Sequence, residues 1–160
     1  MRRKDRDVTR IETVLEIAGK AKILHLGLFD DEYPYVVPLH YGYEYTGGSL
    51  AFFMHCANEG RKLDLINRCP NVCVTLECDV EPVSGSSPCG YGSSYASVIG
   101  FGRAEIVSGR PEKIKGLKLL MKNQTGRDFT FDAGAADSVA VIKVVISEFT
   151  AKAADRRLCE

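Results

Sequence analysis

A tight turn between two alternating apolar runs constrains the fold more than any other feature of this sequence. The runs Tyr35–Tyr45 and Ser49–His55 are separated only by the turn residues around Gly47-Gly48. A glycine-rich loop of this length joins antiparallel strands, because glycine accepts the positive φ angles that such turns need. The two runs are therefore predicted to form a hairpin. A doubly wound fold, in which parallel strands need long crossovers, fits this connection poorly.

The turn also sets which side chains lie opposite each other. Loops of two or four residues both pair Tyr45 with Leu50, and counting outward along the strands pairs His40 with His55. Since side chains alternate between the faces of a strand, one face is apolar and aromatic and is expected to line a barrel interior. This face carries Val37, Leu39, Tyr41, Tyr43, Tyr45, Leu50, Phe52 and Met54.

The opposite face of the hairpin is too apolar for a surface that meets only water. It carries Val36, Pro38, His40, Gly42, Glu44, Ala51, Phe53 and His55. Gly42 lies inside a strand, where the missing side chain lets another group approach closely. A ligand, a second subunit or a helix packed over the strands would each explain this face.

Three helices are expected around the strands. The first covers about residues 9–20 and begins with a T-x-x-E capping box at Thr9. The second covers Arg61–Arg68. The third has Pro111 in its first turn and ends before Gly126, positions that suit these two residue types.

Four further apolar runs complete a set of six strands. The run before the hairpin stops at Asp30-Asp31-Glu32, and the Pro-, Ser- and Gly-rich segment 82–92 is expected to be a loop. The runs cover residues 22–29, 72–78, 95–107 and 139–149. Because hairpin-linked strands dominate, we expect a mainly β protein with flanking helices. The predicted architecture is a six-stranded antiparallel β-barrel in one domain, residues 1–160.

Charge and cysteine usage exclude several classes of function. The chain has 21 Lys and Arg against 21 Asp and Glu, so no overall positive field favours nucleic acid or an anionic membrane. No apolar run approaches the length of a secretory signal or membrane span, and a cytoplasmic location is expected. None of the six cysteines stands at C-x-x-C spacing, so separate thiols are expected there rather than a zinc site.

Two adjacent cations stand where a strand gives way to a helix. The strand ends at His55-Cys56, and Arg61 and Lys62 open the helix. Unpaired N–H groups at a helix start, together with two cations, form a phosphate site on physical grounds. The alternative is a pair of solvated charges. A metal held by the histidines is disfavoured, because two ligands are too few, and no metal site is predicted.

Three stretches, taken in order and spacing, resemble a known family. They are "YPYVVPLHYGYEY", "FFMHCANEGRKLDLINRCPNV" and "SYASVIGFGRAEIV". They are similar to the FMN-binding split β-barrel proteins related to pyridoxamine 5′-phosphate oxidase, and most similar to the nitroimidazole-resistance (Nim-type) branch. The resemblance runs from about residue 1 to about residue 152, and the EGRK-helix-NRCPNV segment is its most specific part.

The resemblance implies a split barrel that forms a homodimer, with FMN, or alternatively FAD, bound in the dimer interface. It places His55 and Cys56 against the flavin and assigns Gly60, Arg61 and Lys62 to the cofactor, the two cations at its phosphate. The segment expected along the isoalloxazine and ribityl chain, partly through main-chain hydrogen bonds, consists of Val36, Val37, Pro38, Leu39, His40 and Tyr41.

The implied activity is that of a flavin-dependent oxidoreductase acting on a small molecule, with a nicotinamide as candidate reductant. Ser97 matches a flavin-contacting position that some members supply from the partner subunit. His55 or His40 could donate a proton or hydrogen bond near the ring, and His55 is the candidate catalytic residue. Vitamin-B6 oxidation is disfavoured, because Val36 and Tyr41 replace the family's arginine and substrate-binding lysine, and the chain has no tryptophan. The alternatives are a non-enzymatic flavin binder and a haem-binding split barrel using His40 or His55.

Overall fold

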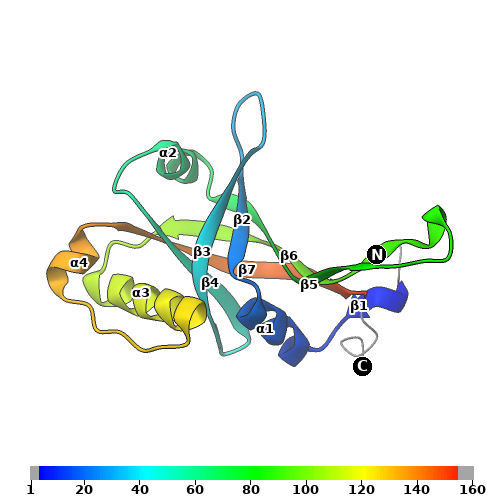
Figure 1. The fold of residues 1–160 in the computed structure, drawn as a ribbon. Helices are drawn as coiled ribbons and strands as arrows, with labels where there is room; N and C mark the ends of the chain where they lie inside the picture. The colour runs from blue at the N-terminus through cyan, green and yellow to red at the C-terminus, as the bar shows by residue number, and fades with distance from the viewer. Residues whose placement is uncertain (1–3, 155–160) are drawn as a thin grey trace.

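The computed structural model describes residues 4–154, in which one antiparallel sheet closes on itself (Figure 1). The strand order is β1-β7-β4-β3-β2-β5-β6, and a further ladder between β7 and β6 closes the ring. The strands are β1 (Asp7–Val8), β2 (Ile23–Leu28), β3 (Tyr35–Thr46), β4 (Ser49–Cys56), β5 (Asn71–Val83), β6 (Gly92–Ile106) and β7 (Ala140–Ala153). Since β1 only extends the edge of β7 by two residues, six strands build the barrel, and the predicted six-stranded antiparallel β-barrel is confirmed.

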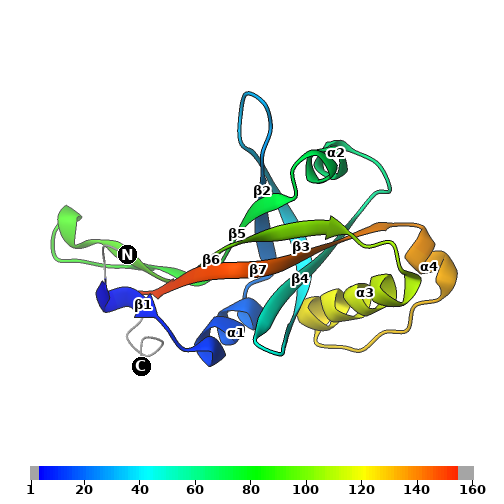
Figure 2. The ribbon, with the colours of Figure 1, turned by 180° about the vertical axis from the view of Figure 1, so that it is seen from behind.

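Two helices close the ends of the barrel. Helix α1 (Ile11–Lys20) and helix α2 (Arg61–Arg68) lie at opposite ends, and the view from behind in Figure 2 shows the same separation. Their apolar side chains join the barrel interior in one core, which includes Val14 and Ile17 of α1, Leu63 and Ile66 of α2, and Phe52 of β4. Burying this apolar surface is the main favourable contribution to folding.

The other two helices lie outside the barrel. Helix α3 (Arg110–Thr125) and the short helix α4 (Ala133–Asp137) pack on the outer face of β4. A second apolar cluster forms there, made of Ala51, Phe53, Val107, Leu117, Ala136 and Val141. Helix α4 was not predicted from the sequence, and the side chain of Asp132 caps its first turn.

The outer face of the hairpin divides into two halves. A Cβ built on Gly42 would lie 2.2 Å from backbone atoms of Leu119 and Leu120, so α3 crosses β3 in direct backbone contact. A helix packed over the strands therefore explains the half of this face that lies nearer the turn. Val36, Pro38 and His40 remain exposed at the other half, which is open to a ligand or a second subunit.

The predicted hairpin register is confirmed over most of its length. Tyr45 pairs with Leu50 and Tyr41 with Met54. The expected pairing of His40 with His55 is wrong, because the ladder ends at Tyr41. From Tyr35 to His40 the strand β3 pairs instead along its other edge with β2, while His55 pairs with Val141 of β7.

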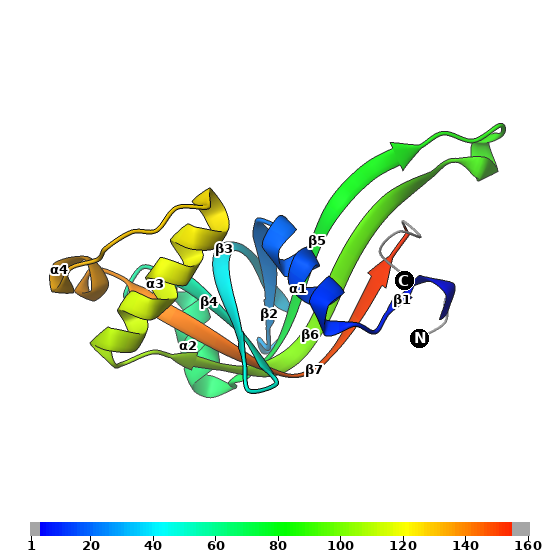
Figure 3. The same ribbon diagram turned by 90° about the horizontal axis from the view of Figure 1, so that it is seen from below.

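Three smaller expectations are also wrong. Helix α1 has Arg10 as its N-cap residue, with no side-chain cap, so the capping box at Thr9 does not form. Tyr45 is 40% exposed, because it lies next to the turn and beyond the barrel interior. The expected loop 82–92 is partly strand, since β5 and β6 remain paired as far as Val83 and Gly92 and form the projecting arm seen in Figure 3.

The cysteines of the described part of the chain are all free thiols: Cys56, Cys69, Cys73, Cys78 and Cys89. Cys159, for which a separate thiol was also expected, and the first three residues of the resemblance lie outside the described residues. No helix between residues 4 and 154 is long and apolar enough to span a membrane.

Candidate functional site

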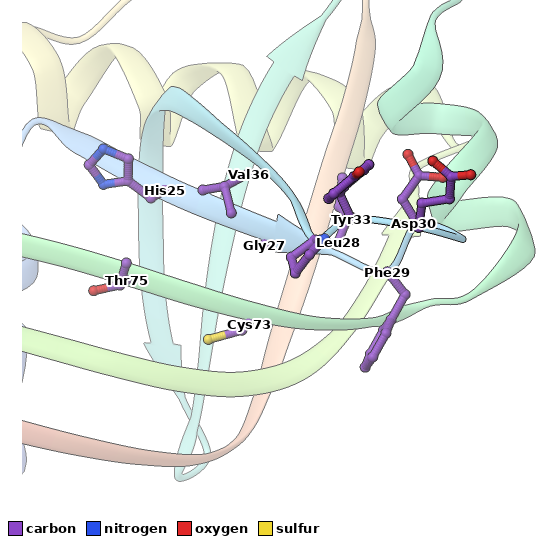
Figure 4. A pocket seen from close by; sticks show the side chains of 11 residues that line it. His25, Gly27, Leu28, Phe29, Asp30, Tyr33, Val36, Cys73 and Thr75 are labelled. Carbon is purple, nitrogen blue, oxygen red and sulfur yellow. The ribbon is translucent and has the colours of Figure 1, made fainter.

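A cavity of about 370 Å³ opens on the outer face of the barrel, between β2, β5 and the loop that follows β2 (Figure 4). Gly27 forms part of its floor, because β2 pairs along both edges and sets Gly27 between Val36 and Cys73. With no side chain at Gly27, the space between these two neighbours stays open. Figure 4 places His25 at one end of the cavity and Asp30 at the other, beside α2.

Arg61, the first residue of α2, is held by the loop at this end. Its Nε donates a hydrogen bond of 2.8 Å to Oδ2 of Asp30, and its Nη2 donates to the same oxygen. The guanidinium also lies 5.0 Å from the ring centroid of Tyr35, in cation–π contact. The Arg61 side chain nevertheless remains 64% exposed, so its other edge faces outward.

The Asp30 carboxylate is itself fixed in place. Its Oδ1 accepts a hydrogen bond of 2.9 Å from the backbone N–H of Asp31, and its side chain is only 12% exposed. This backbone bond, followed by the bond from Arg61, lowers the pKa of Asp30 below its ordinary value. Asp30 therefore stays negatively charged at neutral pH. From the sequence, Asp30 was interpreted only as a residue that ends a strand, so this role was not predicted.

Of the three cations on α2, only Lys62 lacks an acidic partner among residues 4–154. Arg68 donates a bond of 2.9 Å to Oδ1 of Asp31 and lies 3.9 Å from Oδ1 of Asp30. Lys62 is half-buried and near enough to Cys56 for its charge to oppose the rise in the Cys56 pKa that burial causes. The charge of Lys62 thus remains available for a ligand.

The predicted segment 36–41 places alternate residues on opposite faces. Val36, Pro38 and His40 lie on the outer surface, whereas Val37, Leu39 and Tyr41 face the interior. The Tyr41 side chain is fully buried. Its hydroxyl lies 2.7 Å from the Ala18 carbonyl and 3.0 Å from that of Ala21, and burial raises its pKa. The three inward residues can therefore reach an outer ligand only through their backbone.

The remaining predicted residues are spread over two regions. His55 is exposed and Cys56 half-buried at the end of β4, shortly before Gly60, the N-cap residue of α2. Gly60 has φ +135°, a backbone conformation that side chains disfavour. Ser97 lies elsewhere. Gly102 of β6 is level with Leu28 at the end of β2, because both pair with the same residue of β5. Ser97 is about 16 Å from Gly102 along β6, and so lies away from this end of the barrel.

The apolar outer surface continues beyond the cavity onto β6. Phe101 pairs with Cys73, and Ile99 pairs with Thr75. These two side chains are 46% and 41% exposed, and Val36 is 57% exposed. Large exposed apolar surfaces of this kind mark sites of interaction. Within residues 4–154 no group of three or more His, Cys, Asp or Glu side chains could hold a metal ion.

Comparison with known proteins places this geometry in context. A family model described as pyridoxamine 5′-phosphate oxidase matches residues 10–153. A candidate 5-nitroimidazole antibiotic resistance protein from Bacteroides thetaiotaomicron superposes with a TM-score of 0.78 at 28% identity, covering 92% of this chain and 86% of that one. No curated protein sequence matches the chain.

Two further solved structures share the fold at lower identity. The flavocytochrome Anf3 from Azotobacter vinelandii has a TM-score of 0.73 and 22% identity, over 91% of this chain and 68% of that one. The FAD and haem binding protein from Mycobacterium smegmatis has a TM-score of 0.76 and 16% identity, over 92% and 73%. At these identities the likeness shows the fold alone.

Proposed function

Because this chain belongs to the pyridoxamine 5′-phosphate oxidase family, we propose that it is a flavin-dependent oxidoreductase that holds FMN by its phosphate at the start of α2. The observation that carries the proposal is a pair of adjacent cations at the start of α2: Arg61 is bound to Asp30, which lines one end of the apolar cavity, and Lys62 has no acidic partner among residues 4–154. The first N–H groups of a helix have no partner within the helix. Together with two cations they suit a phosphate.

The residues present fit an FMN molecule at both of its ends. A phosphate monoester carries nearly two negative charges at neutral pH, which Arg61 and Lys62 can bind with charge-assisted hydrogen bonds. The apolar outer surface, with Val36 and Pro38 exposed, suits a flat aromatic ring. FMN is proposed over FAD because the phosphate of FMN carries nearly two negative charges on one group, whereas each phosphate of FAD carries only one.

The bound flavin would supply electron and hydride transfer, and the protein would supply binding and orientation. Val36 and Pro38 would pack against the ring, and the backbone between them would offer hydrogen bonds. His55, exposed at the end of β4, is proposed as the proton donor.

A second copy of the chain is proposed to cover the ring. Val36, Ile99 and Phe101 form an exposed apolar surface that runs from the cavity across the sheet, and water would be excluded if a copy packed there. Ser97 of that copy would then reach the flavin, since within one chain it lies far from α2. The free thiols of the described chain suit a reducing, cytoplasmic location.

The test is to purify the protein and to identify any bound cofactor by its visible spectrum and by mass spectrometry. Anaerobic addition of NADH or NADPH should bleach the flavin band, and a 5-nitroimidazole or another small electron acceptor should restore it. A colourless protein that gains no stability from added FMN would contradict the proposal. Bound flavin that no nicotinamide reduces would favour a flavin carrier, and a Soret band would favour haem.

A further inference from the structure

We infer that Asp30 is a functional part of the phosphate site. It holds Arg61 by one edge and cancels its charge, so that Arg61 supplies directed hydrogen bonds while Lys62 supplies the net attraction for the phosphate. This inference rests on the proposed function. It adds a residue from the β2–β3 loop, 31 positions from Arg61, to a site expected only from the start of α2.

The geometry of the pair leaves half of the guanidinium free. Nε and Nη2 of Arg61 both donate to Oδ2 of Asp30, which uses one edge of the group. Nη1 has no partner within the described chain and belongs to the edge that a second anion can approach. Guanidinium binds carboxylates and phosphates through such edges, so Asp30 and a phosphate can share Arg61.

Arg61 is also restrained before any ligand arrives. Asp30 is fixed by the backbone of Asp31, and the Tyr35 ring lies against the guanidinium. A free arginine side chain loses rotamer freedom when a ligand immobilises it. The two contacts have already restricted Arg61, and phosphate binding then costs less entropy.

The charges on α2 show which cation attracts the ligand from a distance. Arg61 is balanced by Asp30 and Arg68 by Asp31, whereas Lys62 has no acidic partner among residues 4–154. A balanced ion pair exerts little field beyond its immediate neighbourhood. Lys62 therefore provides the part of the attraction that salt screens.

The experiment measures the affinities of FMN and riboflavin for the full-length protein at low and high salt. Arg61→Gln should weaken FMN binding roughly 30-fold, because it removes charge-assisted bonds and leaves Asp30 as an unpaired anion near the phosphate. Adding Asp30→Asn to that variant should recover at least about threefold of the affinity, since the repulsion is gone. Asp30→Asn alone should change the FMN affinity by less than about threefold. The variant no longer restrains Arg61, which weakens binding, but it also no longer repels the phosphate, which strengthens binding.

Salt dependence separates the roles of the two cations. Lys62→Gln should weaken FMN binding mainly at low salt, whereas Arg61→Gln with Asp30→Asn keeps the net charge and should show the wild-type salt dependence. The matched control is Arg110→Gln with Asp137→Asn. This exposed ion pair, with a hydrogen bond of 2.8 Å, joins α3 to α4, and its removal keeps the net charge and should leave FMN affinity unchanged.

Riboflavin lacks the phosphate and should bind every variant as it binds the wild type, which also reports that each variant is folded. The inference is overturned if Asp30→Asn fails to rescue Arg61→Gln. It is equally overturned if Asp30→Asn alone strengthens FMN binding more than about tenfold, because Asp30 would then compete with the phosphate. A wild-type protein that binds neither flavin would instead refute the proposed function itself.

Discussion

Gly42 of β3 and Leu119 of α3 lie so close that a Cβ on Gly42 would be 2.2 Å from the carbonyl carbon of Leu119. Because the contact is with backbone rather than with a flexible side chain, no rotamer change can relieve it. This contact brings α3 onto one half of the hairpin face. The other half, with Val36 and His40, is left open beside the candidate site.

Replacing Gly42 with Ala should therefore lower the free energy of unfolding by about 1–3 kcal/mol, since α3 must shift away from β3. Denaturant unfolding measures this change. Gly27→Ala is the matched control, because a Cβ there would meet Cys73 O at 3.4 Å, an ordinary contact distance. Equal stability of the two variants would show that α3 does not press on β3.

Filling the cavity floor should separate flavin binding from stability. Gly27→Val places a branched side chain between Val36 and Cys73, where strand backbone favours valine. We expect FMN affinity to fall by about tenfold or more, a loss of roughly 1.4 kcal/mol, with no loss of thermal stability. Titrating Gly27→Val and Gly27→Ala with FMN tests this, and the affinity of Gly27→Ala is expected to lie between those of the wild type and Gly27→Val. An unchanged affinity would place the ring outside the cavity.

Tyr41 should matter for the fold rather than for the cofactor. Its buried hydroxyl lies within hydrogen-bond distance of the carbonyl oxygens of Ala18 and Ala21, and Tyr41→Phe would leave these oxygens without that donor. The expected cost is about 1–3 kcal/mol of unfolding free energy, measured by denaturant titration. Tyr43→Phe, which removes one bond of 3.2 Å to Leu15, should cost less. A large drop in flavin affinity with unchanged stability would assign Tyr41 a direct role instead.

The ion pair between Asp30 and Arg61 should weaken in acid. The pKa of Asp30 is lower in the folded protein than its ordinary value of 3.8, so the unfolded chain takes up a proton first as the pH falls. The stabilisation from Asp30 is complete above pH 3.8 and is lost below it. Unfolding midpoints measured across this range should fall less steeply for Asp30→Asn than for the wild type. Identical slopes would mean that the pair does not form in solution.

Local signals in the sequence were sufficient for much of the barrel. The Gly47-Gly48 turn set the pairing of Tyr45 with Leu50, and α2 begins and ends where its sequence predicts. Alternation along β3 separated the inward Tyr41 from the outward Val36. These features depend on residues that are close together in the chain, so they could be predicted from the sequence alone.

The candidate site required contacts that no local pattern encodes. His40 and His55 separate because β3 pairs with β2 up to His40 and with β4 from Tyr41 onward, a consequence of closing the barrel. Asp30 reaches Arg61 only when β2 and α2 pack at the same end. A short run of acidic residues looks the same whether it ends a strand or binds a distant arginine.

Residue spacing along the chain was thus enough to specify strands, turns and the cations at the start of α2. The folded arrangement was needed to show which cation is already paired, where the cavity lies and which half of the hairpin α3 covers. The physical reason is that pairing, burial and charge balance depend on residues far apart in sequence, whose distances are set by how the sheet closes.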